Sequence, residues 1–196
     1  MAGKTKISID VSFNKSIQLK HVAGSALQKE KDGQKTKRTL GVTKPKVEFS
    51  QPVLHWDEVS DPINKTITLA IKEVTARVTF SARIWIDKRI DKKCECYAHV
   101  FDHEKRHAKI WQAGVKKYSS AIQKAVEDAT LPKMDAPEEM KESKAKAFRT
   151  DAFKRIDIAF NEAVIKYGKK ISAESKKIHT SSELKKTNNL CEEYLL

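Results

Sequence analysis

The sequence predicts an α+β protein in which an N-terminal antiparallel β-sheet is followed by an α-helical hairpin. Two hydrophobic periods predict this class. Apolar and polar residues alternate through much of residues 1–90, which is the period of a strand with one buried face. Residues 97–171 instead carry apolar side chains three or four positions apart, which is the period of an amphipathic helix. We therefore expect a single domain over residues 1–171 and a polar C-terminal tail over 172–196.

The β-rich part begins with a clear alternation over residues 7–13, which extends toward Ile17 and Leu19. Residues 20–38 are polar and rich in lysine, and we expect a mobile basic loop there. The strongest strand signal covers residues 74–86. Shorter strands are predicted at 39–43, 47–50 and 66–71.

The first helix of the hairpin is predicted over about residues 97–129, and its apolar stripe contains His103 and His107. Residues 130–134 then break the periodic pattern. Asp135 as a helix N-cap, followed by Pro137 and Glu138, predicts the start of a second helix that runs to about residues 167–170.

The composition describes a chain of 196 residues with a heavily charged surface. Charged residues make up 33% of the chain and hydrophobic residues 39%, and no apolar run reaches the about 20 residues of a membrane span. The first residues lack the apolar core of a secretory signal. We therefore expect a soluble cytoplasmic protein with no membrane partner, with export by another route left open.

The net charge is +13, because 39 lysines and arginines outnumber 26 acidic residues. Such an excess attracts polyanions. The basic residues are mostly scattered lysines and form no arginine-rich stripe interleaved with aromatic residues. The charge therefore predicts nonspecific polyanion binding.

The three cysteines are Cys94, Cys96 and Cys191, too few and too odd in number for a disulfide framework. We expect free thiols in a reducing compartment. A metal role for Cys94 and Cys96 is the alternative, although no second Cys/His pair has the usual zinc-finger spacing.

The segment His103-Glu104-Lys105-Arg106-His107 has the pattern H-E-x-x-H. Residues four apart lie on one face of a helix, so His103 and His107 can bind one Zn²⁺, and Glu104 can reach a water bound to that ion. The alternatives are histidines that are satisfied within the core, or a solvated helix face.

A third ligand is expected from the second helix, because two helices joined by a short loop pack antiparallel. With the midpoint near Pro132, His107 is level with about Asp157. Glu162 is our first choice for the third ligand and Asp157 the alternative, and each can equally be a surface acid. His179, in the tail, is a remote alternative ligand.

This pattern resembles the zincin superfamily of zinc metallopeptidases. Phe160-Asn161-Glu162-Ala163 resembles the Asn-Glu-Ala stretch that bears the glutamate ligand in gluzincins, and the β-rich first half is similar to a family of small bacterial probable zinc-dependent proteases. The resemblance implies Zn²⁺ on His103, His107 and an acid, with Glu104 as general base in peptide hydrolysis.

The resemblance also implies that a peptide substrate pairs with the strand at 74–86 as an added strand. An oxyanion is then stabilised by Tyr167, Tyr118 or His99, among which the sequence does not choose. Two other classes stay open. The first is a non-enzymatic protein with a structural zinc site, such as a phage or particle component, and the second is a nucleic-acid-binding protein.

Overall fold

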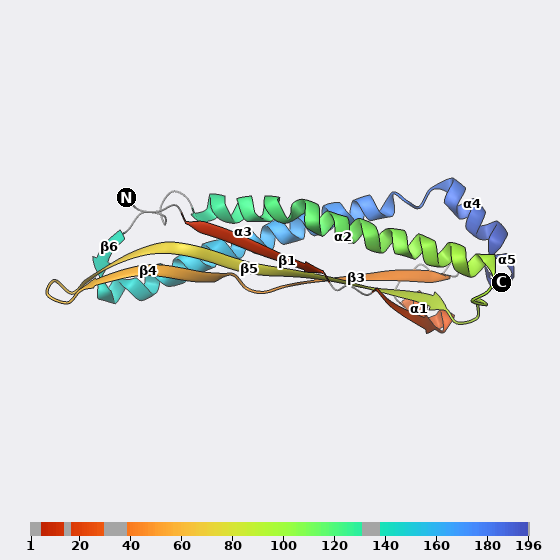
Figure 1. Ribbon diagram of the computed structural model, residues 1–196, viewed down its shortest axis with the longest axis horizontal. Helices are drawn as coiled ribbons and strands as arrows, with labels where there is room; N and C mark the ends of the chain where they lie inside the picture. The colour runs from red at the N-terminus through yellow and green to blue at the C-terminus, as the bar shows by residue number, and fades with distance from the viewer. Residues whose placement is uncertain (1–4, 14–16, 30–38, 131–137, 196) are drawn as a thin grey trace. The chain divides into compact units, whose positions relative to one another are not determined.

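The computed structural model describes residues 5–13, 17–29, 39–130 and 138–195, and Figure 1 shows its helices and strands. Contacts divide the chain into two compact units. The first unit comprises Met1–Ser12, Glu48–Thr79 and Lys116–Gly168, and the second comprises Phe13–Val47, Phe80–Val115 and Lys169–Leu196. The mixture of helices with a multi-stranded sheet confirms the predicted combination of α and β structure.

The strands are β1 (Lys6–Phe13), β2 (Gln18–Val22), β3 (Gly41–Phe49), β4 (Val53–Asp61), β5 (Thr66–Asp87) and β6 (Glu138–Lys141). The helices are α1 (Gly24–Lys29), α2 (Glu95–Thr130), α3 (Glu142–Lys176), α4 (Ser181–Leu190) and α5 (Glu192–Leu195).

Strand β5 is the centre of the sheet, and each of the other five described strands pairs with it. It joins the two segments that we predicted separately at 66–71 and 74–86, and alternate side chains along it are buried. The strand expected to receive a peptide at a free edge is therefore an interior strand. That expectation is wrong because strands from distant parts of the chain occupy the positions beside it.

In the first unit, β4 and β6 both run antiparallel to β5. Ile67 and Leu69 of β5 form a buried cluster with Ala145 of α3, and Trp56 and Phe148 pack against it. Alternation along β5 thus provides the apolar face that α3 covers.

In the second unit, β2 pairs with β5 in parallel, from Gln18 opposite Arg83 to Val22 opposite Asp87. The predicted antiparallel arrangement is therefore wrong for this pair. A parallel pair needs a connection of about a dozen residues or more, and the chain between β2 and β5 contains α1, β3 and β4. Residues 20–29, expected in the mobile loop, form the end of β2 and α1, while 30–38 lie outside the described residues.

Helix α2 agrees with the helix predicted over about 97–129. Helix α3 begins later than predicted, because Glu138 lies in β6, while Asp135 and Pro137 lie outside the described residues. It also continues through Gly168 to Lys176. Glycine inside a helix costs about 1 kcal/mol, which the packing of a long helix offsets.

The segment expected as a polar tail belongs to the second unit, where it forms the end of α3, then α4 and α5. Thr180 is the N-cap of α4, and its side chain accepts a hydrogen bond from the backbone N–H of Glu183. Cys191, directly after α4, is fully buried.

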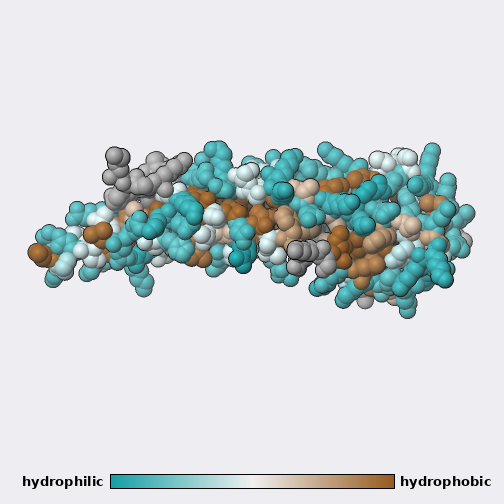
Figure 2. Space-filling model, in the orientation of Figure 1, coloured by the Kyte–Doolittle hydropathy of each residue, from teal (hydrophilic) through white to brown (hydrophobic). Residues whose placement is uncertain are grey.

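On the face of the protein that Figure 2 shows, hydrophilic residues predominate and apolar residues form patches among them. Among the described residues, no helix combines the length and the apolar character that crossing a membrane requires.

Candidate metal centre

Three histidines of the second unit meet beside α2. His103 and His107 lie one turn apart on α2, and His179 lies in the short segment between α3 and α4. One ligand atom from each lies within 4.8 Å of the others, which is close enough to hold a metal ion. In the part of the chain that the structure describes, no other set of three histidine, cysteine or acidic residues meets this condition.

The two helical histidines have the spacing of ligands to one ion. The Nε2 atoms of His103 and His107 are 3.2 Å apart. Two nitrogens that bind a tetrahedral Zn²⁺ at its usual bond length of about 2.0–2.1 Å lie about 3.3 Å apart. A single zinc ion therefore fits between these two atoms.

The opposite nitrogen of each ring is held by a polar side chain. Nδ1 of His103 lies 3.3 Å from Oε1 of Glu183, and Nδ1 of His107 lies 2.7 Å from Oγ of Ser175. An ionised carboxylate only accepts hydrogen bonds, so Nδ1 of His103 is the donor, and Nε2 of the neutral ring carries a lone pair. Metal-binding histidines usually show this arrangement.

The same atoms also form a continuous hydrogen-bond chain from Ser175 to Glu183 that needs no ion. Ser175 can donate to His107, the Nε2–H of His107 can donate to Nε2 of His103, and His103 can donate to Glu183. This chain is the satisfied-histidine alternative that the sequence left open. Metal binding would replace the hydrogen bond between the two rings and make Ser175 an acceptor.

The electrostatics keep His107 neutral. Burial, together with the nearby charges of His103, His179 and Arg106, lowers the pKa of His107 to about 4, and burial is the largest cause. A neutral imidazole is the form that binds a metal, so His107 is ready to act as a ligand at neutral pH.

A cavity of about 700 Å³ lies between α2 and α4, and its lining does not include His103, His107 or His179. Arg106 and Glu183, which form an ion pair, line it, and both also lie against His103. His99 lines it too and shares a hydrogen bond of 2.9 Å with Thr187. The remaining lining residues are Glu95, Ala98, Asp102, Lys105, Lys109, Lys186 and Leu190.

Glu104 faces a different neighbour from the histidines. It is buried, and its Oε2 and its backbone carbonyl each lie 2.7 Å from the hydroxyl of Thr43 on β3. Successive residues of a helix do not share a face, so His103 can point to α4 while Glu104 points to β3. The role of Glu104 as general base stays a prediction, and it requires the carboxylate to exchange Thr43 for a water.

The predicted third ligands are not part of the histidine group. Glu162 and Asp157 lie on the portion of α3 in the first unit, and their role stays a prediction. The residue of α3 that contacts His107 is Ser175 rather than Asp157. The expectation that Asp157 lies opposite His107 was wrong, because β6 precedes α3 and that helix begins only at Glu142.

The residues proposed to stabilise an oxyanion are spread over both units. Tyr167 and Tyr118 stack on each other in the first unit, with ring centroids 4.7 Å apart. His99 is in the second unit with the three histidines. Burial lowers the pKa of His99, and Lys186 lowers it further.

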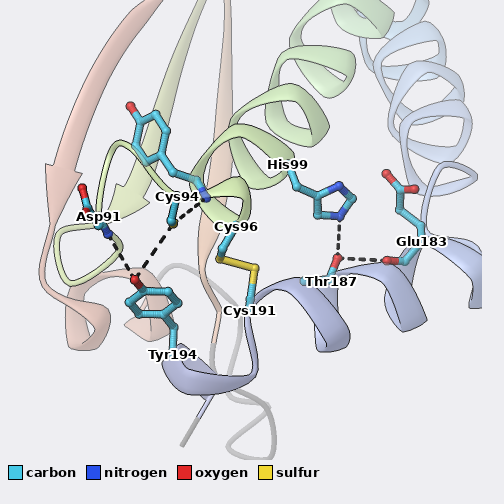
Figure 3. The surroundings of a disulfide bond; sticks show 9 residues. Asp91, Cys94, Cys96, His99, Glu183, Thr187, Cys191 and Tyr194 are labelled. Atoms are coloured by element: carbon cyan, nitrogen blue, oxygen red, sulfur yellow. Dashed lines mark hydrogen bonds between the residues drawn. A yellow bond between two sulfur atoms is a disulfide. The ribbon is translucent and has the colours of Figure 1, made fainter.

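Cys96 and Cys191 form a disulfide, with Cα atoms 5.0 Å apart, while Cys94 is free (Figure 3). The expectation of three free thiols is therefore wrong. An odd count of cysteines does not reveal that two of them are buried side by side. The sequence did not identify Glu183 and Ser175 as neighbours of the histidines. A pairing of Cys96 with Cys191 would have indicated them, because it brings the residues before Cys191 close to α2.

Comparisons of the chain with protein-family models, curated proteins and solved structures find no match.

Proposed function

We propose that the protein binds one Zn²⁺ through His103, His107 and His179. One observation carries this proposal: the Nε2 atoms of His103 and His107 face each other at 3.2 Å, while both Nδ1 atoms are held by other side chains. Imidazole nitrogens suit zinc, and three protein ligands leave the fourth position for water, as in catalytic zinc sites.

The test is the metal content of the purified protein, measured by mass spectrometry after exchange into zinc-containing buffer and removal of free metal. We expect about one zinc per wild-type chain and a loss of it in His103→Ala and His107→Ala. His55→Ala is the matched control, because His55 is exposed on β4 in the other unit. A wild-type protein that stays free of zinc contradicts the proposal.

We propose peptide hydrolysis as the reaction that such a site carries out, with a peptide or protein as substrate. The support is the H-E-x-x-H spacing, the group of three histidines and the cavity whose lining residues Arg106 and Glu183 contact His103. The ion would lower the pKa of a water molecule bound to it. Glu104 would accept the proton of that water and deliver it to the leaving amine.

A structural zinc site in a non-enzymatic binding or assembly protein is the second candidate. The hydrogen-bonding distance between Thr43 and the Glu104 carboxylate favours it, because a carboxylate that stays on β3 does not meet a metal-bound water. The ion would then stabilise the junction of α2 with the segment that carries His179.

Glu104→Gln separates the two candidates. In a zinc peptidase, this variant keeps its zinc and loses at least about 100-fold in cleavage of a fluorescently labelled unfolded protein, because general-base catalysis contributes about 10²–10⁴-fold. In a structural site, the zinc-loaded wild type and Glu104→Gln are equally inactive.

A further inference from the structure

We propose that the Cys96–Cys191 disulfide controls the zinc affinity of the histidine group, so that the oxidised protein binds the ion more tightly than the reduced one. This inference rests on the proposed zinc site. It starts from the positions of the two cysteines. Cys96 lies in the first turn of α2, about two turns before His103, and Cys191 directly follows α4 (Figure 3). The bond thus joins the end of α4 to the helix that carries two of the three histidines.

Helix α4 has little else to hold it in place. None of its residues is buried. Its polar contacts to α2 include the Thr187–His99 hydrogen bond and the contacts of Glu183 with His103 and Arg106. The Arg106–Glu183 ion pair is partly exposed at Arg106, and surface ion pairs contribute about 0–1 kcal/mol.

Apolar packing near α4 is concentrated at the disulfide itself. Cys96 and Cys191 are buried in a cluster with Ile84, Ile86 and Val100. Leu190, Tyr194 and Leu195 pack against this cluster only partly buried. The covalent bond is therefore the strongest link of α4 to α2, and reduction leaves α4 held by partly buried apolar packing and by the polar contacts of Thr187 and Glu183.

The anchor matters for the metal because α4 and the turn before it carry two parts of the site. Glu183 holds Nδ1 of His103, and His179 directly precedes the N-cap Thr180. Fixing Cys191 on α2 keeps Glu183 at high effective concentration beside His103, while His179 is also held from α3, whose Ser175 contacts His107. Loss of a partner of a metal-binding histidine, such as Glu183, typically weakens metal binding about 10–100-fold.

The chemical step is the reduction of one disulfide. Two electrons and two protons convert the Cys96–Cys191 bond into two thiols, and a dithiol reductant supplies them and becomes a disulfide itself. Reducing compartments keep protein thiols in this form. Zinc occupancy would then follow the redox state of the surroundings.

The test is a competition titration of Zn²⁺ against a chromophoric chelator. We compare the oxidised wild type with Cys96→Ser/Cys191→Ser, and we expect the double variant to bind zinc about 10–100-fold more weakly. Serine is required because freed thiolates are zinc ligands themselves. Cys94→Ser is the matched control, since Cys94 lies two residues from Cys96 but outside the disulfide, and we expect its affinity to be unchanged.

A second preparation without the disulfide provides the same test if the double variant does not fold. The folded wild type is reduced with a phosphine, its thiols are blocked with iodoacetamide, and the reagents are removed before the titration. We expect the same 10–100-fold weakening, together with faster hydrogen exchange in α4 than in the oxidised protein.

The outcomes separate this inference from the proposed function. An oxidised wild type that binds no zinc overturns the zinc site and the disulfide control together. Equal zinc affinity in the oxidised wild type and in either disulfide-free form overturns the disulfide control alone.

Discussion

Glu104 shows how much a single residue's role depends on its neighbours in space. In the chain it lies between two histidines that meet at one site, yet its carboxylate lies against Thr43 of β3. Gly41 makes this approach possible, because a Cβ there would lie 2.7 Å from Val100 and 3.0 Å from Cγ of Glu104. A buried carboxylate needs such hydrogen-bond donors to remain charged.

Thr43→Val should destabilise the protein by about 1–3 kcal/mol, because the buried Glu104 carboxylate loses a donor. Valine keeps the shape of threonine and suits a strand, so β3 should form normally. The measurement is the free energy of unfolding in urea. An unchanged free energy of unfolding would mean that water solvates the Glu104 carboxylate.

The lowered pKa of His107 predicts how the stability of the zinc-free protein depends on pH. Its pKa is about 4 in the folded protein and near the ordinary 6.5 in the unfolded chain. Between these values the unfolded chain binds more protons, so the contribution of His107 to stability is lost as the pH falls from about 6.5 to about 4.

Urea unfolding at several pH values, with a chelator present, measures this effect. The zinc-free wild type should lose more stability than His107→Ala as the pH is lowered through this window. Parallel stability profiles of the two proteins would show that His107 titrates normally in the folded state.

At the scale of secondary structure, the contact of α2 with α3 depends on one glycine. In the second unit, Ile171 and Ser175 of α3 lie against Gly114 and His107 of α2, so the two helices run in opposite directions. A Cβ on Gly114 would lie 2.6 Å from Cγ1 of Ile171, which is itself buried. The absence of a side chain at Gly114 therefore brings Ser175 close enough to hold His107.

Gly114→Ala should destabilise the protein by about 1–3 kcal/mol, because Ile171 cannot move aside within a packed core. Gly168→Ala is the matched control in the other helix, where an added Cβ meets nothing within 4 Å. That variant should gain about 0.5–1 kcal/mol, since alanine favours the helix. Thermal and urea unfolding measure both, and a stable Gly114→Ala protein would contradict the close packing.

The long, regular hydrophobic patterns made two elements predictable from the sequence. The stripe of α2 and the alternation of β5 are long and regular, so the sequence located both elements. The prediction from the sequence was wrong at the connection before α3. Glu138 has the features of a helix start, yet it lies in β6 and pairs with Leu69. A sheet edge offered by a distant segment overrode the local preference.

At the scale of the whole molecule, the charge of +13 predicts nonspecific binding to polyanions. We expect measurable binding to duplex DNA of any sequence at low salt, and a loss of at least about tenfold in affinity between 50 and 200 mM salt. Fluorescence anisotropy with two unrelated DNA sequences measures both features. Strong sequence preference, or an affinity that salt does not change, would contradict this prediction.

The sequence by itself determined the class of the fold, the long helix α2 and the pairing of His103 with His107 on one helix face. These features depend on the fixed geometry of helix and strand, which a hydrophobic pattern reports directly. Only the tertiary structure decided that β5 is central, that Glu104 turns to β3, and that His179, Glu183 and Ser175 complete the histidine site. Those contacts join residues about 60 to 80 positions apart in the chain, and they depend on a disulfide and on close packing at Gly114, which no local pattern encodes.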